Sequence, residues 1–239
     1  MDRTYIRQEM LLGEEAMKRL RTAHVGVFGI GGVGSWCAEA LVRGGVGALT
    51  FVDNDEVGET NLNRQLIALR STLGRNKAEV MAERALDINP NCRVRVLPGL
   101  YCEDSKAYFF DGASYDYIAD CIDLVSCKLS LIMEARSRGI PIVSAMGTGN
   151  KLDPSRLRLA DISETKGCPL ARVMRRELRT RGVTGHTVVY SEEQPLKPSQ
   201  PEAPPPGRRE IPGSVSWVPS AAGLMLAGYV IRQIAGCPL

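Results

Sequence analysis

The stretch HVGVFGIGGVG, residues 24–34, joins a short apolar run to a cluster of glycines. Gly29, Gly31 and Gly34 have the G-x-G-x-x-G spacing, and Gly32 lies inside the same loop. Glycines in this pattern let the chain turn sharply after a strand and let a phosphate group approach the backbone at the start of a helix. The stretch therefore predicts a strand, a nucleotide-binding loop and a helix.

Strand patterns and helical patterns alternate on the C-terminal side of this loop. The segment ALTFVDND, residues 48–55, is typical of a second buried strand and completes a βαβ unit with parallel strands. Further strands are expected at 92–99, 115–123 and 140–147, with helices at 74–90 and 127–139. The alternation indicates an α/β fold with a Rossmann-like doubly wound sheet, mostly parallel in the N-terminal half.

The pattern changes after Gly149. Residues 156–162, RLRLADI, predict a strand that extends the sheet, and residues 168–182 predict a helix. Residues 191–213 predict a proline-rich loop that holds half of the chain's 14 prolines. The apolar stretch that follows predicts a terminal helix, which we expect to start after Pro219 and to pack on the core or on a partner.

Four arginines mark the helix predicted at 168–182. Arg172, Arg175, Arg176 and Arg179 recur at helical spacing and therefore share one face. Such a face is either solvated or a set of contacts for nucleic-acid phosphates. The formal net charge of +3 is too small to indicate nucleic-acid binding by itself.

Cysteine and histidine usage disfavours several kinds of site. The 7 cysteines form no CxxC pair, which argues against a four-cysteine zinc site and favours reduced thiols over a disulfide framework. Only 2 histidines are present, so a histidine-rich metal site or a histidine-based triad is poorly supported.

Length and composition indicate a soluble, globular chain of one large α/β domain or two small ones, and we expect a single domain over residues 1–239. Residues 1–23 are expected to form one or two short amphipathic helices, residues 24–150 the nucleotide-binding core, and residues 151–239 the substrate-facing part. No run reaches the roughly 20 apolar residues that cross a bilayer, and the N-terminus is too polar for a signal peptide. We therefore expect a cytoplasmic protein with no membrane span.

The polar residues after the glycine loop distinguish the possible nucleotides. Asp53, at the end of the second strand, is placed to accept hydrogen bonds from ribose hydroxyls. Arg64 and Lys77 together can neutralise β- and γ-phosphates and a leaving pyrophosphate, whereas a dinucleotide has one pyrophosphate. ATP is therefore the expected nucleotide, and an NAD-dependent oxidoreductase is the alternative.

The segment DCID offers two carboxylates, Asp120 and Asp123, at the carboxyl end of a predicted strand. A carboxylate there can hold a magnesium ion against phosphates. The alternative for this segment is a cap of the helix predicted at 127–139.

Taken in order, GIGGVGS, FVDNDEVGETNLNRQ, GRNKAEV and DCID resemble the ThiF/MoeB adenylating superfamily, the bacterial relatives of ubiquitin-activating enzymes. The resemblance covers roughly residues 3 to 150 and implies ATP with Mg²⁺. It implies that Asp53 holds the ribose, that Asn61, Arg64 and Lys77 hold phosphates, and that Asp123 ligates the metal.

The opening DRTYIRQEMLL resembles the N-terminal signature of the same superfamily. The resemblance implies that residues 1–23 are dimerisation helices and that Arg7 crosses a homodimer interface to the partner's ATP. The catalytic set implied is Arg7, Arg64, Lys77 and Asp123. The alternative for Arg7 is a surface ion pair.

The second half resembles the branch of tRNA threonylcarbamoyladenosine dehydratases, in the segments CPLARVMRRELRTRG, VVYSEEQPLKP and GSVSWVPSAAGL. The resemblance implies a tRNA substrate, modified on the adenosine beside the anticodon. Superfamily members that activate sulfur-carrier proteins usually have two zinc-binding CxxC pairs, which this chain lacks. Adenylylation of a sulfur carrier is the alternative, a silent nucleotide-binding scaffold is another, and binding of a sulfur-relay protein stays open.

The implied reaction activates a carboxylate. Transfer of AMP from ATP converts the threonyl carboxylate into a mixed anhydride, and the neighbouring carbamoyl group then closes a five-membered ring and expels AMP. An intramolecular nucleophile has a very high effective concentration, so no enzyme nucleophile is required. Activation by γ-phosphoryl transfer, with ADP as product, is the open alternative.

Overall fold

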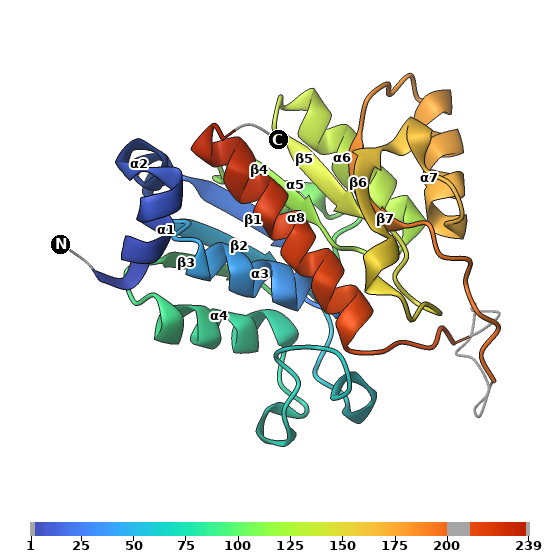
Figure 1. Ribbon diagram of the computed structural model, residues 1–239, viewed down its shortest axis with the longest axis horizontal. Helices are drawn as coiled ribbons and strands as arrows, with labels where there is room; N and C mark the ends of the chain where they lie inside the picture. The colour runs from blue at the N-terminus through green and yellow to red at the C-terminus, as the bar shows by residue number, and fades with distance from the viewer. Residues whose placement is uncertain (1–2, 200–210, 238–239) are drawn as a thin grey trace.

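A seven-stranded sheet runs through the molecule, and the computed structural model describes it and its helices over residues 3–199 and 211–237 (Figure 1). The strand order is β3-β2-β1-β4-β5-β7-β6, and every neighbouring pair is parallel except β6 and β7. The strands are β1 His24–Phe28, β2 Ala48–Val52, β3 Arg93–Leu97, β4 Tyr117–Asp120, β5 Ile142–Ala145, β6 Leu157–Asp161 and β7 Thr187–Ser191. The predicted doubly wound sheet, with an extension in the second half, is confirmed.

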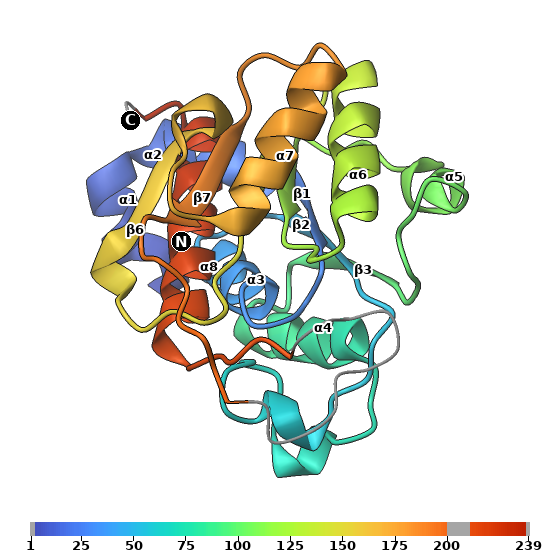
Figure 2. The ribbon, with the colours of Figure 1, turned by 90° about the vertical axis from the view of Figure 1, so that its right-hand side faces the viewer.

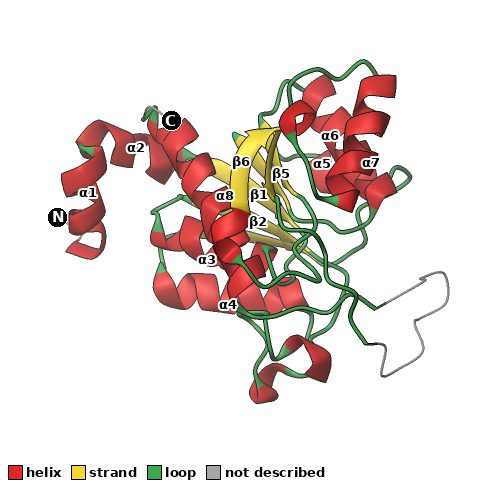
Figure 3. Cartoon of the chain, turned by 45° about the vertical axis from the view of Figure 1, so that its right-hand side comes forward, coloured by secondary structure: helices red, strands yellow, loops and turns green. Residues whose placement is uncertain are grey.

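Helices cover both faces of this sheet (Figures 2 and 3). The helices are α1 Ile6–Leu12, α2 Glu14–Thr22, α3 Gly34–Arg43, α4 Lys77–Ile88, α5 Lys106–Phe110, α6 Val125–Ser137, α7 Pro169–Thr180 and α8 Trp217–Ala235. Because side chains alternate along a strand, Val25 and Val27 of β1 face a core shared with α2, α3, α4 and α8, whereas Phe28 faces a core with α5 and α6. A third core lies between α6, α7 and β7.

The sheet reverses its winding between β1 and β4. From β1 the chain builds outward through β2 and β3, and it then returns to place β4 on the other side of β1. In a parallel sheet, this reversal opens a crevice at the carboxyl ends of the two strands. The loops after β1, β2, β4 and β5 therefore meet at one edge.

The terminal helix α8 begins earlier than the sequence predicts. It starts at Trp217, so Pro219 lies inside its first turn. Proline is tolerated there because the amide that it lacks would have no partner within the helix. Among the described helices, α8 alone is long and apolar enough by length and composition to cross a membrane, a test that core helices also pass. In this fold it packs against α3 and the sheet.

The N-terminal segment forms two short helices, as predicted. Helix α2 packs on α8 and buries Ala16, Met17 and Leu20 in the core, whereas α1 has no buried residue. Leu12 packs partly against the core, whereas Ile6, Met10 and Leu11 are exposed, Met10 and Leu11 at 80% and 87%. Helix α1 therefore presents an apolar surface at the end of the molecule opposite α7 (Figure 1).

The arginine face of α7 is smaller than the spacing predicts. Arg175 is half-buried, and its Nη1 donates to the carbonyl and the hydroxyl of Thr165, 2.5 and 2.7 Å away. Arg176 forms an ion pair with Glu177 at 2.9 Å. Arg172, Arg176 and Arg179 are all exposed. The predicted four-arginine face is therefore wrong for Arg175, whose guanidinium fixes the loop before the helix.

Candidate functional site

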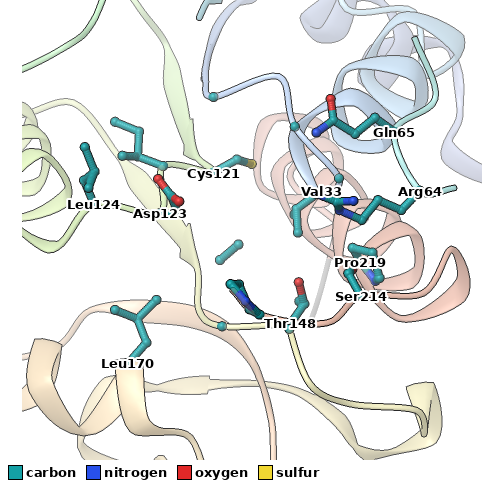
Figure 4. A pocket seen from close by; sticks show the side chains of 18 of the residues that line it. Val33, Arg64, Gln65, Cys121, Asp123, Leu124, Thr148, Leu170, Ser214 and Pro219 are labelled. Atoms are coloured by element: carbon teal, nitrogen blue, oxygen red, sulfur yellow. The ribbon is translucent and has the colours of Figure 1, made fainter. Parts of the chain in front are cut away.

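A cavity of about 770 Å³ lies at the carboxyl edge of the sheet. One half is lined by the glycine loop and by the segments that follow β2 and β4, which carry Asp53, Arg64, Lys77 and Asp123. The other half is lined by residues 146–151, 168–170 and 212–214. Figure 4 shows side chains from both halves around one common space. We call the two parts the nucleotide half and the distal half.

The four loop glycines have two separate roles. Gly29 has a φ of +90°, and a Cβ there would lie 2.8 Å from the carbonyl oxygen of Cys121. A Cβ on Gly34 would lie 1.7 Å from the carbonyl oxygen of Gly29. These two positions therefore require glycine for backbone packing. Gly34, in contrast to the prediction, does not line the cavity.

Gly31 and Gly32 leave room for a ligand. A Cβ on Gly31 would meet only the Gln65 side chain, 3.9 Å away, so the space above this residue is open to the cavity. Helix α3 begins directly after the loop and directs its first amide groups toward it. This combination suits the phosphates of a nucleotide.

Asp53 follows β2 and is held by backbone amides. Its two carboxylate oxygens accept hydrogen bonds from the amides of Ile30 and Asp55, at 2.6 and 2.8 Å. Burial raises the pKa of Asp53, and these two hydrogen bonds and Lys77 oppose the rise. Each oxygen retains a second lone pair that can accept a ribose hydroxyl.

Lys77 is buried at the first position of α4. The helix starts here because the Asn76 side chain accepts hydrogen bonds from the amides of Ala78 and Glu79. The Lys77 ammonium lies 2.8 Å from the carboxylate of Asp55, whose side chain is 59% exposed. The ion pair holds a cation at the wall of the nucleotide half, where it can interact with phosphates.

The segment of residues 58–65 supplies the remaining polar groups. The side-chain oxygen Oδ1 of Asn61 accepts a hydrogen bond from the amide of Gly58 at 3.0 Å and shapes the turn. The Nη1 atom of Arg64 donates to the carbonyl oxygen of Thr60 at 2.7 Å, and burial lowers the pKa of Arg64. Gln65 is buried, and its Oε1 has no partner among the described residues. A buried carbonyl without a donor is costly, so this atom fits a ligand or water in the cavity.

The two carboxylates of DCID have different surroundings. Asp120 is completely buried; it forms an ion pair with Lys128 at 2.8 Å and accepts from the Ser144 hydroxyl at 2.6 Å. The prediction that Asp120 could ligate a metal ion is therefore wrong, because its buried carboxylate already binds Lys128 and Ser144. Asp123 lines the cavity, and its carboxylate points into the common space in Figure 4.

No cluster of three or more potential metal-ligating side chains occurs within residues 3–199 and 211–237. Asp123 therefore lines the cavity without belonging to such a cluster, and Asp53 and Asp55 line it as well. Magnesium is commonly held by one or two carboxylates together with substrate phosphates. The donor set fits a magnesium ion that arrives with a nucleotide.

Arg7 is the one predicted catalytic residue that lies away from the cavity. It is exposed on α1, and its side chain makes no hydrogen bond or ion pair with any other residue in the described part of the chain. The predicted surface ion pair is therefore absent there. Within one protomer, Arg7 does not reach the nucleotide half.

The sequence patterns assigned residues 151–239 to the substrate side but identified no site residue of the distal half. Its residues come from the loop after β5, from the start of α7, and from the chain just before α8. One signal was available: the segment MGTGNK, residues 146–151, directly follows a predicted strand and hence lies at the ligand-binding edge of the sheet.

Comparison with known proteins gives the family. The ThiF family model matches residues 5–239. The chain belongs to the ThiF family. This ThiF family chain is 41% identical to the tRNA threonylcarbamoyladenosine dehydratase of Bacillus subtilis, over 96% of the chain and 94% of that enzyme. It is 42% identical to the Escherichia coli enzyme of the same name, over 79% of the chain and 73% of that enzyme.

Solved structures agree. The ThiF family chain superimposes with a TM-score of 0.86 on the E. coli tRNA N6-threonylcarbamoyladenosine dehydratase in complex with ATP, at 36% identity, covering 97% of this chain and 93% of that one. The complex of that enzyme with AMP gives the same TM-score at 37% identity, covering 96% and 93%. The resemblance to the E. coli enzyme now extends to the fold of the whole chain.

Proposed function

We propose that the protein is an ATP-dependent enzyme that dehydrates N6-threonylcarbamoyladenosine in tRNA to its cyclic form. The observation that carries the proposal is the single cavity, in which a nucleotide half and a distal half share one space. Two substrates that exchange a group must meet in such a space. Near full-length similarity to dehydratases, one of them solved with ATP, supports the assignment.

The first step forms an acyl adenylate. An oxygen of the threonyl carboxylate attacks the α-phosphorus of ATP, the bond from that phosphorus to the bridging oxygen breaks, and pyrophosphate leaves. Lys77 and Arg64 offset the negative charge of the phosphates, and the amides of the glycine loop bind them. Asn61 contributes its side-chain amide, and Asp53 holds the ribose.

The second step closes the ring. The carbamoyl group attacks the activated carboxyl carbon, AMP leaves, and the attacking group loses a proton. The summed change in the nucleoside is the loss of one water. The chain needs only to hold the two reacting groups together and to exclude bulk water, because the nucleophile belongs to the substrate.

We assign the metal to Asp123. A magnesium ion held by Asp123 would supply positive charge and would help to orient the triphosphate. The Asp123 carboxylate points into the cavity, which supports this role, and the absence of a larger cluster of ligating side chains among the described residues fits an ion shared with the substrate.

We further propose that the protein works as a homodimer in the cytoplasm. The exposed apolar side chains of α1 are suited to burial against a second copy, and Arg7, which has no partner within the described chain, is free to reach that copy's nucleotide. Among the exposed arginines of α7, Arg172 and Arg179 form no ion pair within the described chain and are suited to contacts with tRNA phosphates.

Mass analysis of nucleosides tests the function. Transfer RNA that carries threonylcarbamoyladenosine is incubated with the protein, ATP and magnesium, and its nucleosides are prepared gently. We expect loss of one water mass that requires ATP, with AMP and pyrophosphate as co-products. An unchanged nucleoside mass would reject the proposal, whereas ADP as co-product would reject only the adenylate step.

A further inference from the structure

A buried lysine lies in the distal half of the cavity. Lys151 is 2% exposed, and it lines the cavity at the end of the loop after β5. Its Nζ donates to the carbonyl oxygens of Gly147 and Ser191, at 3.1 and 3.2 Å. Because so little of this residue reaches outer solvent, a ligand can approach its ammonium only through the cavity.

Lys151 forms no ion pair within the described chain, and the nearby Glu193 and Cys168 offset its charge only in part. No carboxylate within residues 3–199 or 211–237 lies within ion-pair distance of its Nζ; the two hydrogen bonds go to neutral carbonyls. An ammonium group has three N–H donors, so one donor is left over. A buried cation is costly unless an anion accompanies it. The site therefore favours an anionic group.

The start of α7 also favours an anion in the distal half. Cys168 is its N-cap and forms no side-chain cap, and Pro169 and Leu170, which open the helix, line the distal half. The first amides of a helix without a side-chain cap are available to an anion, and the helix dipole favours negative charge there.

The loop that carries Lys151 is held in one geometry. Asn150 has a φ of 60°, the only positive value at a described non-glycine residue. Its amide donates to the carbonyl of Gly213 at 2.8 Å, its side chain accepts from the Gly213 amide at 2.6 Å, and its carbonyl accepts from the Leu196 amide at 2.8 Å. Strain of this kind persists where surrounding contacts fix it, often at binding sites.

We propose that Lys151 binds the carboxylate of the nucleoside substrate and holds it for attack on ATP. This inference rests on the proposed function. The cations of the nucleotide half, Arg64 and Lys77, serve the phosphates, so the distal anion is a different group. A surface phosphate of the tRNA is disfavoured because Lys151 is buried, which leaves the threonyl carboxylate.

Binding to two tRNAs tests the inference. One tRNA carries threonylcarbamoyladenosine, and the other has plain adenosine at that position. We expect the natural protein to bind the modified tRNA about 10- to 100-fold more tightly, as a charged hydrogen bond implies, and Lys151→Met to lose this preference. ATP affinity should stay within about twofold, because Lys151 does not contact the nucleotide half. Lys106→Met, on α5 and away from the cavity, should leave both affinities unchanged.

The pH profile of turnover separates binding from a purely structural role. Burial lowers the pKa of Lys151, and the neighbouring Cys168 and Glu193 oppose this shift. Turnover should therefore fall at alkaline pH as the ammonium loses its proton. Lys151→Arg should keep the tRNA preference and lose the alkaline fall, since a guanidinium stays charged.

The outcomes are distinct. A preference for modified tRNA that survives Lys151→Met, or an alkaline fall that is unchanged in Lys151→Arg, overturns the inference. If Lys151→Met does not fold, as judged by lost ATP binding, Lys151→Arg decides alone. If the natural protein neither prefers nor dehydrates the modified tRNA, the proposed function itself fails.

Discussion

Asp120 begins a buried polar network behind the cavity. Its ion pair with Lys128 joins two side chains that are both completely buried. Ser144 donates to Asp120, and the Ser144 oxygen lies 2.9 Å from Nε2 of His186. The network ties β4, β5, α6 and the segment before β7 together. A buried ion pair of this kind is costly to break, by about 3–5 kcal/mol when one partner is removed.

His186 makes the stability of this network depend on pH. Burial, with help from Lys128 and Arg136, lowers the pKa of His186 to about 4. Below about pH 6.5 the unfolded chain therefore binds a proton that the folded chain does not accept until about pH 4. The contribution of neutral His186 is complete above pH 6.5 and is lost as the pH falls toward 4, about 3 kcal/mol in all.

Urea unfolding between pH 7 and pH 4 measures this effect. We expect the free energy of unfolding of His186→Gln to fall by about 3 kcal/mol less than that of the natural protein over this range. Parallel curves for the two proteins would show that His186 has no part in the acid sensitivity.

At the scale of elements, α8 crosses α3 at a position where no side chain fits. A Cβ on Gly223 would lie 2.3 Å from the carbonyl oxygen of Val33, which lies within the glycine loop. Gly228, in the same helix, has nothing within 4 Å of such a Cβ. The two glycines therefore form a matched pair, one required by packing and one replaceable.

We expect Gly223→Ala and Gly228→Ala to act in opposite directions. Gly223→Ala should destabilise the fold by about 1–3 kcal/mol through overpacking and should weaken ATP binding, because the strain reaches Val33. Gly228→Ala should stabilise by up to about 1 kcal/mol through helix propensity and should leave ATP binding unchanged. Thermal unfolding and ATP titration measure both. Equal effects of the two substitutions would contradict the packing argument.

The periodicity of apolar residues predicted the long and regular helices and strands. It failed for short elements and for side chains whose partners are distant in the sequence. The strands of the parallel core and helices α3, α4, α6 and α7 follow from apolar spacing. Helix α5 has only 5 residues, too few for a period, and β7 is a short run buried along most of its length. The partner of Arg175 could not be predicted, because Thr165 comes beside it only after folding.

The candidate site shows the same division. The residues of the nucleotide half could be predicted, because they belong to short sequence motifs that directly follow predicted strands. The distal half unites residues 146–151, 168–170 and 212–214, which lie in loops without periodicity and meet only through the sheet order. Nothing in the sequence around Lys151 indicates that this residue is buried.

At the scale of the whole molecule, we predict that each active site combines Asp123 of one protomer with Arg7 of its partner. If Arg7 acts on the partner's ATP, Arg7→Ala and Asp123→Asn each inactivate a pure dimer. In a random mixture of the two variants, half of the dimers contain one Arg7→Ala subunit and one Asp123→Asn subunit. Each of these mixed dimers has one site in which both Arg7 and Asp123 are intact. About a quarter of the sites should then be active.

Activity of equal mixtures, after exchange of subunits, measures this recovery. Mixtures that stay as inactive as the two separate variants would contradict action across the interface. Full activity of Arg7→Ala alone would remove Arg7 from the catalytic set. Sedimentation of each variant serves as the control, because loss of the dimer would imitate loss of Arg7.

The hydrogen bonds of Asn150 also define how the chain tolerates changes in length. One residue fixes Leu196 on one side and Gly213 on the other, so both ends of the proline-rich segment between them are anchored at the cavity. The entropy of closing a loop grows slowly, by about 0.6 kcal/mol for each doubling of its length. Insertions between these anchors should therefore leave the active geometry in place, and this segment is the natural point for attaching a probe or a further domain.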